Sequence, residues 1–264
     1  MATPSPDPRK VCVITGSSSG IGAATARLYA RNGWHVVINY SREAAPAEAV
    51  AADCRALGQP HGADALVVQA NVALDADCRR LADAVTTRFG RTDVLVNNAG
   101  TTKFVAMKNL DGLDAQDFHD IYSVNVIGAY QMVRALAPLL RLHPVTGIVN
   151  ISSIAGSSGR GSSLAYMASK GALNAMTVGL ARALGPEIRV NAIAPGLVET
   201  PWLQKGLGAE RYAASVKAYR GLAALDAVIS PEDVADAAWW LGAGAAKTTG
   251  EVLLLDAGLR ITKD

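Results

Sequence analysis

The sequence predicts an α/β fold built on a doubly wound parallel sheet, and three observations carry that prediction. Short β-branched apolar runs alternate with longer segments of helical periodicity along the chain. A glycine-rich turn joins the first apolar run to the first helical segment. Parallel strands need a covering crossover between them, and the alternation supplies one each time. We expect residues 1–264 to form one domain of this kind, with helices on both faces of the sheet.

The elements follow in a regular order. The expected strands are residues 10–15, 35–39, 66–69, 94–96, 147–151, 188–193 and 252–255. The expected helices are residues 21–32, 44–57, 75–88, about 114–140, 164–184 and 231–241. Gly33 is typical of a helix C-terminus, and Ser230 followed by Pro231 is typical of an N-cap and first helical position. The stretch from residue 197 to about 227 is less regular and is expected to form a lid.

Composition excludes several classes of protein. Half of the residues are hydrophobic and 18% are charged, which excludes a solvated disordered chain. The net charge of +2 gives no indication of a nucleic-acid partner. Cys12, Cys54 and Cys78 are an odd number without metal-ligand spacing, so we expect reduced structural thiols and no metal site.

The N-terminal segment is polar and rich in proline. Residues 1–9 are expected to fray before the first strand, and they resemble neither a signal peptide nor an anchor. The chain has no apolar run long enough to span a bilayer. We therefore expect a soluble cytoplasmic protein with no membrane partner.

Tyr166 and Lys170 lie four residues apart, a spacing that places a phenol and an ammonium on one helix face. A neighbouring cation favours the phenolate, so we expect the pKa of Tyr166 to fall below its usual value of about 10. Ser153 precedes Tyr166 by thirteen residues, at the end of an expected strand, where its hydroxyl could bind a substrate oxygen. The alternative for Tyr166 and Lys170 is a purely structural one, a partly buried tyrosine beside a solvated lysine. Ser152 is the alternative to Ser153 as the serine that faces the site.

These residues belong to a longer series of motifs. The series includes the loop Thr15-Gly-Ser-Ser-Ser-Gly-Ile-Gly22, the run Asn97-Asn-Ala-Gly100, Asn125, and the run Arg189-Val-Asn-Ala-Ile-Ala-Pro-Gly196. In that order and spacing the chain resembles the classical short-chain dehydrogenase/reductase family, from the first strand almost to the C-terminus. The resemblance implies a Rossmann-like sheet of seven strands in the order 3-2-1-4-5-6-7. It further implies a homodimer or homotetramer that pairs the helices near 114–140 and 164–184.

The resemblance also implies a catalytic set of Asn125, Ser153, Tyr166 and Lys170. Ser153 and Tyr166 would hold the substrate oxygen, and Tyr166 would exchange the proton. Lys170 would also hydrogen-bond the nicotinamide ribose, while Asn125 would hold a water that connects Lys170 to solvent. The alternatives are a strand-end hydroxyl for Ser153 and an amide that fills a polar gap inside a helix for Asn125.

A dinucleotide site is expected at the glycine loop. Gly16, Gly20 and Gly22 follow a strand and open a helix, where backbone must approach a pyrophosphate at the positive helix end. Asn71 stands where the family commonly has an aspartate that contacts adenine. The expected cofactor contacts from the loop and from the resemblance are Gly16, Ser18, Ser19, Gly20, Ile21, Gly22, Asn71, Val72, Asn98, Ala99, Gly100, Tyr166, Lys170, Pro195, Gly196, Val198 and Thr200.

The end of the second strand bears on the choice between NADP and NAD. Tyr40, Ser41 and Arg42 stand there without a carboxylate that would hold the ribose hydroxyls. Ser41 could donate to a 2'-phosphate and Arg42 could pair with it, which favours NADP. Glu43 could neutralise Arg42, and the glycine loop carries no Arg or Lys, so NAD is possible.

The function expected from the chain is transfer of a hydride between a nicotinamide cofactor and a carbonyl or secondary alcohol, as an NADPH-linked ketone or 3-oxoacyl reductase. A sugar or polyol dehydrogenase is an alternative, and a nonenzymatic dinucleotide sensor is another. The substrate is expected to be a small molecule. Few basic residues are expected near the entrance to the site, so binding of an acyl carrier protein is unproven; they are Lys103, Lys108, Lys205 and Arg211. Apolar lid residues either contact substrate or pack the lid against the core or a subunit: Trp202, Leu203, Leu207, Tyr212 and Tyr219.

Overall fold

The computed structural model describes residues 9–261. The fraying expected for residues 1–9 lies outside these residues except at Arg9, whose guanidinium Nε donates to the carbonyl of His61 at 2.8 Å. In the described part of the chain, no helix is both long and apolar enough to cross a membrane.

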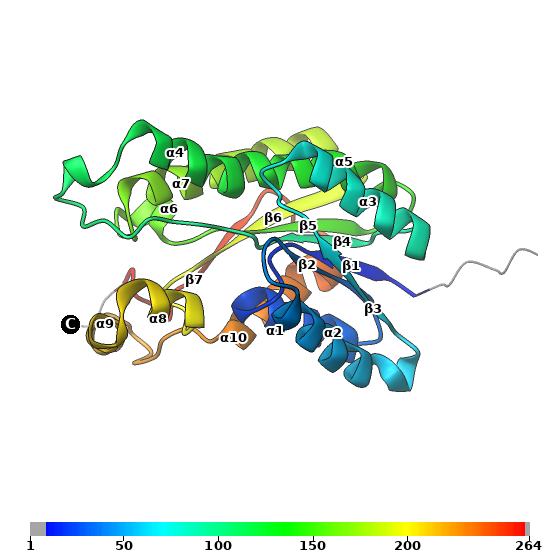
Figure 1. The fold of residues 1–264 in the computed structure, drawn as a ribbon, viewed down its shortest axis with the longest axis horizontal. Coiled ribbons are helices and arrows are strands. Elements are labelled where there is room, and N and C mark those ends of the chain that lie inside the picture. The colour runs from blue at the N-terminus through cyan, green and yellow to red at the C-terminus, as the bar shows by residue number, and fades with distance from the viewer. Residues whose placement is uncertain (1–8, 262–264) are drawn as a thin grey trace, which may run out of the picture.

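Seven parallel strands form one sheet in the order β3-β2-β1-β4-β5-β6-β7, which confirms the expected topology. The strands are β1 (Val11–Ile14), β2 (His35–Tyr40), β3 (Ala65–Gln69), β4 (Val94–Asn97), β5 (Thr146–Ile151), β6 (Ile188–Pro195) and β7 (Val252–Leu255). Every pair is in parallel register, for example Val13 beside Val37 and beside Leu95. All seven strands therefore end at the same edge of the sheet (Figure 1).

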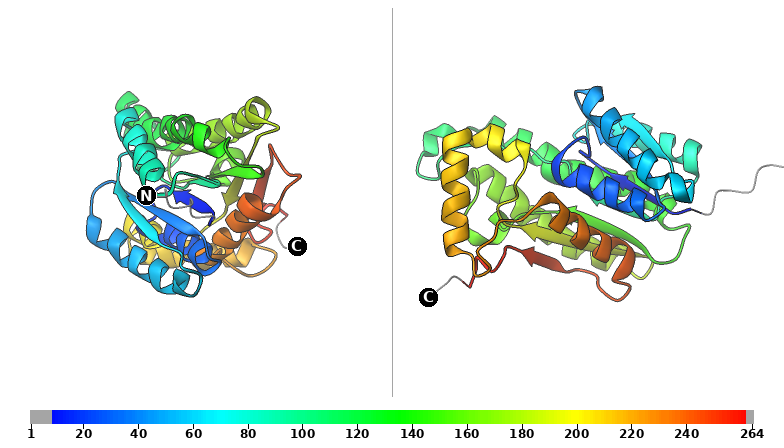
Figure 2. Two further views of the ribbon diagram at one scale, coloured as in Figure 1. Left: turned by 90° about the vertical axis from the view of Figure 1, so that its right-hand side faces the viewer. Right: turned by 90° about the horizontal axis from the view of Figure 1, so that it is seen from below.

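Helices cover both faces of this sheet, as Figure 1 and the left view of Figure 2 show. One face carries α1 (Gly20–Arg31), α2 (Ala44–Gly58) and α10 (Pro231–Trp239). The other carries α3 (Asp75–Phe89), α4 (Ala115–Tyr122), α5 (Ala129–Leu140) and α7 (Leu164–Leu184). The remaining elements are η1 (Gln59–His61), η2 (Leu110–Gly112), η3 (Ser123–Gly128), α6 (Ala155–Ser158), α8 (Pro201–Leu207), α9 (Ala209–Leu222) and η4 (Trp240–Gly244).

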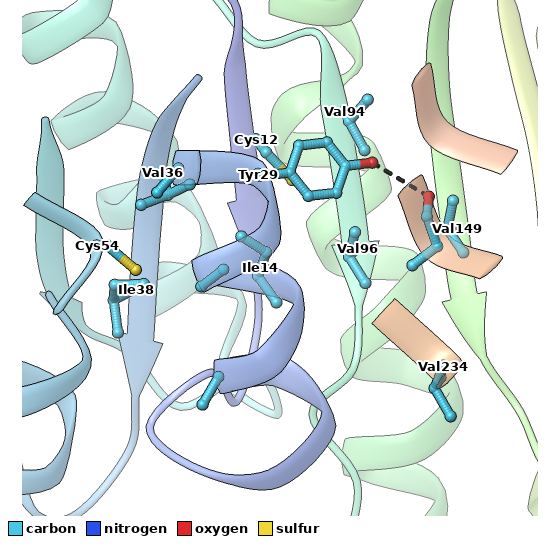
Figure 3. Packing of buried hydrophobic residues seen from close by; sticks show 14 of the residues in the cluster. Cys12, Ile14, Tyr29, Val36, Ile38, Cys54, Val94, Val96, Val149 and Val234 are labelled. Carbon is cyan, nitrogen blue, oxygen red and sulfur yellow. Dashed lines mark hydrogen bonds between the residues drawn. The ribbon is translucent and has the colours of Figure 1, made fainter. Parts of the chain in front are cut away.

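The alternation of side chains along β1 divides the core into two layers. Cys12 and Ile14 pack toward α1 and α10, whereas Val11 and Val13 pack toward α3, α5 and α7. In the first layer the Tyr29 hydroxyl donates to the carbonyl of Ala238 at 3.1 Å, which ties α1 to α10 (Figure 3). The three cysteines are buried free thiols, as expected.

The helix expected over residues 114–140 is interrupted. α4 and α5 are separated by η3, a π-helical turn that contains Asn125. Gly128 lies directly against the segment after β3, where a Cβ on Gly128 would be 2.8 Å from Cγ2 of Val72. Such π turns cluster at functional sites, and here the wider turn places the Asn125 side chain inside the protein, only 1% exposed. Hydrophobic periodicity does not reveal such an insertion.

The last expected helix also ends differently. Ser230 and Asp233 form a capping box at the start of α10, which confirms the predicted N-terminus. The helical run changes to the π turn η4 at Trp240 instead of ending as an α-helix at Leu241. The buried Arg189 guanidinium accounts for this end, because it donates to the carbonyls of Leu241 and Gly242 at 2.6 Å each. A charged donor thus satisfies carbonyls that a helix end leaves open.

Candidate active site

The glycine loop after β1 packs against the loop after β4. A Cβ on Gly16 would lie 2.9 Å from the Cα of Ala99, and a Cβ on Gly22 would lie 2.6 Å from Nδ2 of Asn98 and 2.7 Å from the carbonyl of Gly16. Gly16 and Gly20 also have positive φ angles of 61° and 52°. Side chains at these positions would therefore displace backbone, and this close approach needs glycine.

Hydrogen bonds lock the two loops together. Asn98 donates through Nδ2 to the carbonyls of Thr15 and Gly16, at 2.9 Å each. The Thr15 hydroxyl accepts from the backbone amides of Asn98 and Ala99 at 3.0 Å each. Asn98 thus acts on the loop through its side chain as well as its backbone. Thr15, which begins the loop motif but was not among the expected cofactor contacts, holds the loop through its hydroxyl.

Asn39, at the end of β2, is a second residue that the motif analysis passed over. Its Oδ1 accepts from the amide of Gly16 at 3.0 Å, and its Nδ2 donates to the carbonyl of Ala70 at 3.0 Å. Its backbone amide donates to the Ser17 hydroxyl at 2.9 Å. The buried Asn39 side chain therefore holds the ends of β1, β2 and β3 in place. The sequence feature that could have identified Asn39 is a polar residue inside an otherwise apolar strand.

The first turn of α1 fits an anionic ligand. Ser19 is the N-cap residue, but its side chain makes no capping hydrogen bond, and the first turn contains no acidic residue. The leading amides of a helix have no intrahelical acceptor, and they carry the positive end of the helix dipole. Together with the glycine cradle, this turn suits the pyrophosphate of a dinucleotide.

Ser41 and Arg42 are exposed directly after β2, the strand that pairs with β1. The Ser41 carbonyl accepts from Nε2 of Gln69 at 3.3 Å, which fixes the turn without using the hydroxyl. Within residues 9–261 no ion pair joins Arg42 to Glu43, so the expected neutralisation is absent there. Tyr40, half-buried, ends the strand.

Asn71 and Val72 lie after β3, as the motif order requires. The Asn71 side-chain oxygen accepts from the amide of Ala73 at 3.1 Å, and its backbone amide donates to Asp77 at 2.8 Å. The carbonyl of the buried Val72 accepts from Gln131 at 2.8 Å. The Asn71 side chain therefore stabilises its own turn.

The segment after β6 runs past the glycine loop. Thr200 caps α8 by accepting from the amide of Leu203 at 3.3 Å, and its methyl group lies 3.4 Å from where a Cβ on Gly20 would be. Val198 pairs with Ile229 through an isolated bridge. Gly196 lies against the Tyr219 ring, leaving no room for a side chain there. Of the four residues expected here to contact a cofactor, Thr200 lies next to the glycine loop, whereas the contacts of Pro195, Gly196 and Val198 are with β7, Tyr219 and Ile229.

Ser153 and Tyr166 meet at the carboxyl edge of the sheet. Ser153 follows β5, and Tyr166 lies in the first turn of α7, where Ser163 caps the helix by accepting from the Tyr166 amide at 3.3 Å. The Ser153 hydroxyl interacts with the Tyr166 phenol. Ser152 is buried and turned away, with its hydroxyl 2.5 Å from Oδ1 of Asn174. Of the two serines, Ser153 is therefore the one that faces the Tyr166 phenol.

The effect expected of Lys170 on Tyr166 is not observed. Burial raises the pKa of Tyr166 to about 12, and the hydrogen bond from Ser153 offsets only part of that rise. The ammonium lies over the phenol ring, 5.6 Å from its centroid, and donates to the carbonyl of Ile151 at 2.8 Å. Burial lowers the pKa of Lys170 itself to about 8. The prediction of an acidic phenol was wrong for these residues alone, because desolvation outweighs a cation that does not face the hydroxyl.

Asn125 completes the cluster. Its Oδ1 accepts from the amide of Thr101 at 2.8 Å, and its Nδ2 donates to the carbonyl of Thr101 and the hydroxyl of Ser169, both at 3.0 Å. A Cβ on Gly100 would lie 3.5 Å from Oδ1 of Asn125 and 3.8 Å from Nζ of Lys170. The loop after β4 therefore lies next to both the Asn125 amide and the Lys170 ammonium.

This arrangement can do acid-base chemistry beside a dinucleotide cradle, and comparisons with known proteins agree. A family model described as enoyl-(acyl carrier protein) reductase matches residues 16–260. A Streptomyces violaceoruber protein named as ketoacyl reductase 2 of the granaticin polyketide synthase is 42% identical over 261 residues, covering 99% of this chain and 100% of that protein. The chain belongs to the short-chain dehydrogenase/reductase family. It is thus an oxidoreductase of that type, and the family implies a nicotinamide cofactor.

Two further short-chain dehydrogenase/reductases support this assignment. The 3-oxoacyl-(acyl-carrier-protein) reductase FabG of Thermotoga maritima is 34% identical over 258 residues, covering 96% of this chain and 98% of that protein. The crystal structure of a Burkholderia xenovorans protein described as a short-chain dehydrogenase/reductase is 42% identical, with a TM-score of 0.85 over 97% of this chain and 99% of that chain.

Proposed function

We propose that this protein is an NADPH-linked reductase of ketones or 3-oxoacyl groups. The observation that carries the proposal is the convergence of Ser153, Tyr166, Lys170 and Asn125 beside the glycine cradle, at the edge where all strands end. Ligands bind outside the carboxyl ends of the strands in open parallel sheets. The names of the ketoacyl and 3-oxoacyl reductases to which the chain is similar favour the same substrate class.

The bound nicotinamide supplies the hydride in this reaction. Ser153 and Tyr166 bind the carbonyl oxygen, and Tyr166 gives its proton to that oxygen when the carbon is reduced. Lys170, whose pKa is lowered to about 8, keeps a positive charge over the Tyr166 ring near neutral pH, which favours the phenolate that forms when the proton leaves. Asn125 holds the segment behind this pair, through its three hydrogen bonds to Thr101 and Ser169.

Arg42 and Ser41 support the choice of NADPH. Both are exposed after β2, the strand next to β1 and its glycine loop, and no ion pair with Glu43 competes within the described residues. A guanidinium suits a phosphate because it can donate two parallel hydrogen bonds. We expect Arg42→Ala to weaken NADPH binding about tenfold or more, and to leave NADH binding within about twofold, since only NADPH carries the 2'-phosphate.

Fluorescence titration with both dinucleotides tests this choice. Arg182→Ala is the matched control, because Arg182 is also exposed but lies near the far end of α7. Equal losses for NADPH and NADH in Arg42→Ala would contradict the assignment of Arg42 to the phosphate. Binding of neither dinucleotide to the unmodified protein would overturn the reductase function and the dinucleotide sensor alike.

Turnover tests the catalytic assignment. The panel contains a 3-oxoacyl thioester, simple ketones and an aldose, so that a sugar dehydrogenase would be recognised. Tyr166→Phe should lower turnover by about 10²- to 10⁴-fold while dinucleotide affinity is preserved, because only the proton donor is removed. Ser153→Ala should lower turnover more than Ser152→Ala, whose hydroxyl contacts Asn174 instead. Unchanged turnover in Tyr166→Phe would overturn the mechanism.

The assembly is a further part of the proposal. Phe118, Ile127, Tyr130, Leu164 and Val178 are exposed large apolar side chains on α4, η3, α5 and α7. Burial of such a face stabilises association. We therefore expect the homodimer or homotetramer that the family implies, and sedimentation measures it.

A further inference from the structure

One aromatic side chain of the lid approaches the proposed proton donor. Trp202 is the second residue of α8, and its ring centroid lies 6.5 Å from that of Tyr166 with the planes tilted by 42°. The Trp202 side chain is nevertheless 46% exposed. A large aromatic face that is partly open to solvent and lies near the Tyr166 ring is a candidate contact for substrate.

Phe104 supports Trp202 from the loop after β4. The two ring centroids are 5.7 Å apart, and the Phe104 ring packs directly on α8, because a Cβ on Gly206 would lie 2.0 Å from it. The loop is tied to the segment before α7, since Val105 donates to the carbonyl of Ser162 at 2.8 Å. Glycine at position 206 therefore lets two loops and a helix hold the indole ring against Tyr166.

The other lid aromatics have different surroundings. Tyr219 is buried, and its hydroxyl donates to the carbonyl of Asp256 at 2.7 Å, so it anchors α9 to the core. Tyr212 lines a shallow surface groove with Glu199 and Lys217. Among the lid aromatics in residues 9–261, the ring contact with Tyr166 is made by Trp202.

Charge around the aromatic pair favours a neutral ligand. Lys103, next to Phe104, is held in an ion pair with Asp117 at 2.7 Å. An uncharged aromatic face favours a flat π system over a puckered or hydroxylated ring, because offset stacking places more atoms in contact and buries no hydroxyl. A ketone on or next to a flat ring that stacks on Trp202 would present its oxygen toward Tyr166.

We propose that Trp202, supported by Phe104, determines specificity for ketones carried on a planar aromatic or conjugated ring system. This inference rests on the proposed reductase function. Trp202 contacts the part of the substrate that does not react, so its effect falls on recognition, whereas Tyr166 carries the proton. A saturated ring of the same skeleton gains less from the indole face.

The test compares 2-tetralone with 2-decalone, which share a bicyclic skeleton but differ in the aromatic ring. Trp202→Leu keeps an apolar side chain and removes the indole face, and Trp202→Phe restores an aromatic face. Trp240→Leu is the matched control, because Trp240 is similarly exposed, at 49%, in η4 on the opposite side of the sheet from Tyr166. Steady-state kcat and KM are measured with NADPH for each ketone.

Trp202→Leu should lower kcat/KM for 2-tetralone about tenfold, chiefly through KM, since an aromatic contact and its burial contribute about 1.4 kcal/mol. The value for 2-decalone should change less than about threefold, and Trp202→Phe should recover most of the loss. Equal losses for both ketones would overturn the inference, because they would mean that Trp202 only fills space. Unchanged values for both would also overturn it.

Calorimetric binding of 2-tetralone to the NADP⁺-loaded protein separates this inference from the function on which it rests. If the unmodified protein reduced neither ketone and no other carbonyl compound, the reductase function would be refuted. Equal affinity of the unmodified protein and Trp202→Leu for 2-tetralone would refute the role of Trp202, whatever the turnover. Weaker binding to Trp202→Leu alone, with no loss in Trp240→Leu, supports the planar-ring specificity.

Discussion

Replacing Lys170 by methionine should make the ligand-free protein more stable at neutral pH, while abolishing catalysis. The side chain is 4% exposed, and burial lowers its pKa from an ordinary 10.5 to about 8. Below pH 8 the folded protein holds a buried charge that the unfolded chain would solvate. The lysine therefore opposes folding at pH 7, and methionine of similar length removes this cost.

The magnitude follows from linkage between protonation and folding. A fall from 10.5 to about 8, at about 1.4 kcal/mol per pKa unit, corresponds to about 3 kcal/mol. Methionine also leaves the carbonyl of Ile151 without the donor that now lies at 2.8 Å, which costs about 1–2 kcal/mol. We therefore expect Lys170→Met to be more stable by about 1–2 kcal/mol at pH 7.

The pH dependence is the sharper readout. Between pH 8 and 10.5 the unfolded lysine binds more protons than the folded one, so the cost in the unmodified protein disappears as pH rises through this window. The stability advantage of Lys170→Met should shrink by about 3 kcal/mol and change sign. Urea unfolding at fixed protein concentration measures it, with the exposed Lys247→Met as control. A stability difference that stays constant from pH 7 to 10.5 would refute the buried charge.

Three other outcomes are expected. Gly22→Ala should destabilise the protein by about 1–3 kcal/mol in urea unfolding and weaken dinucleotide binding, because its Cβ would meet the backbone of Gly16 at 2.7 Å. Unchanged dinucleotide affinity would contradict the role of the glycine loop in binding. Tyr219→Phe removes the hydrogen bond to Asp256 and should speed hydrogen exchange in α9 about fivefold, whereas unchanged exchange would mean that the ring alone anchors the lid. Alcohol oxidation should accelerate about tenfold per pH unit from pH 7 to 9, because the phenolate of Tyr166 is scarce there, and a flat profile would exclude Tyr166 as the base.

The sheet was predictable from sequence because its signals are local and mutually consistent. Apolar β-branched runs and glycine-marked turns placed each strand within a residue or two, and β7 was predicted at its observed bounds. The strand order came from the family resemblance, since periodicity does not specify which strands are neighbours. The π turns η3 and η4 were missed, because they depend on tertiary contacts of Gly128 and Arg189 that no window of sequence contains.

The site was predictable in part for the same reason. The residues with motif spacing are brought together, including Ser153 opposite Tyr166. The supporting residues Asn39, Thr15 and Phe104 were missed, because each acts on a segment distant in sequence. The pKa of Tyr166 was predicted in the wrong direction, because spacing on a helix reports that two side chains share a face and does not report desolvation.

The raised pKa of Tyr166 itself bears on the direction of the reaction. A phenol with a pKa of about 12 is fully protonated near neutral pH, so it is ready to donate a proton to a carbonyl oxygen. Alcohol oxidation needs the phenolate, which these surroundings disfavour. Lys170, with a pKa of about 8, retains its proton and its positive charge near neutrality. Both shifts come from the same burial, so the dry surroundings that hold the two side chains also keep Tyr166 in the form that donates a proton, as the proposed carbonyl reduction requires.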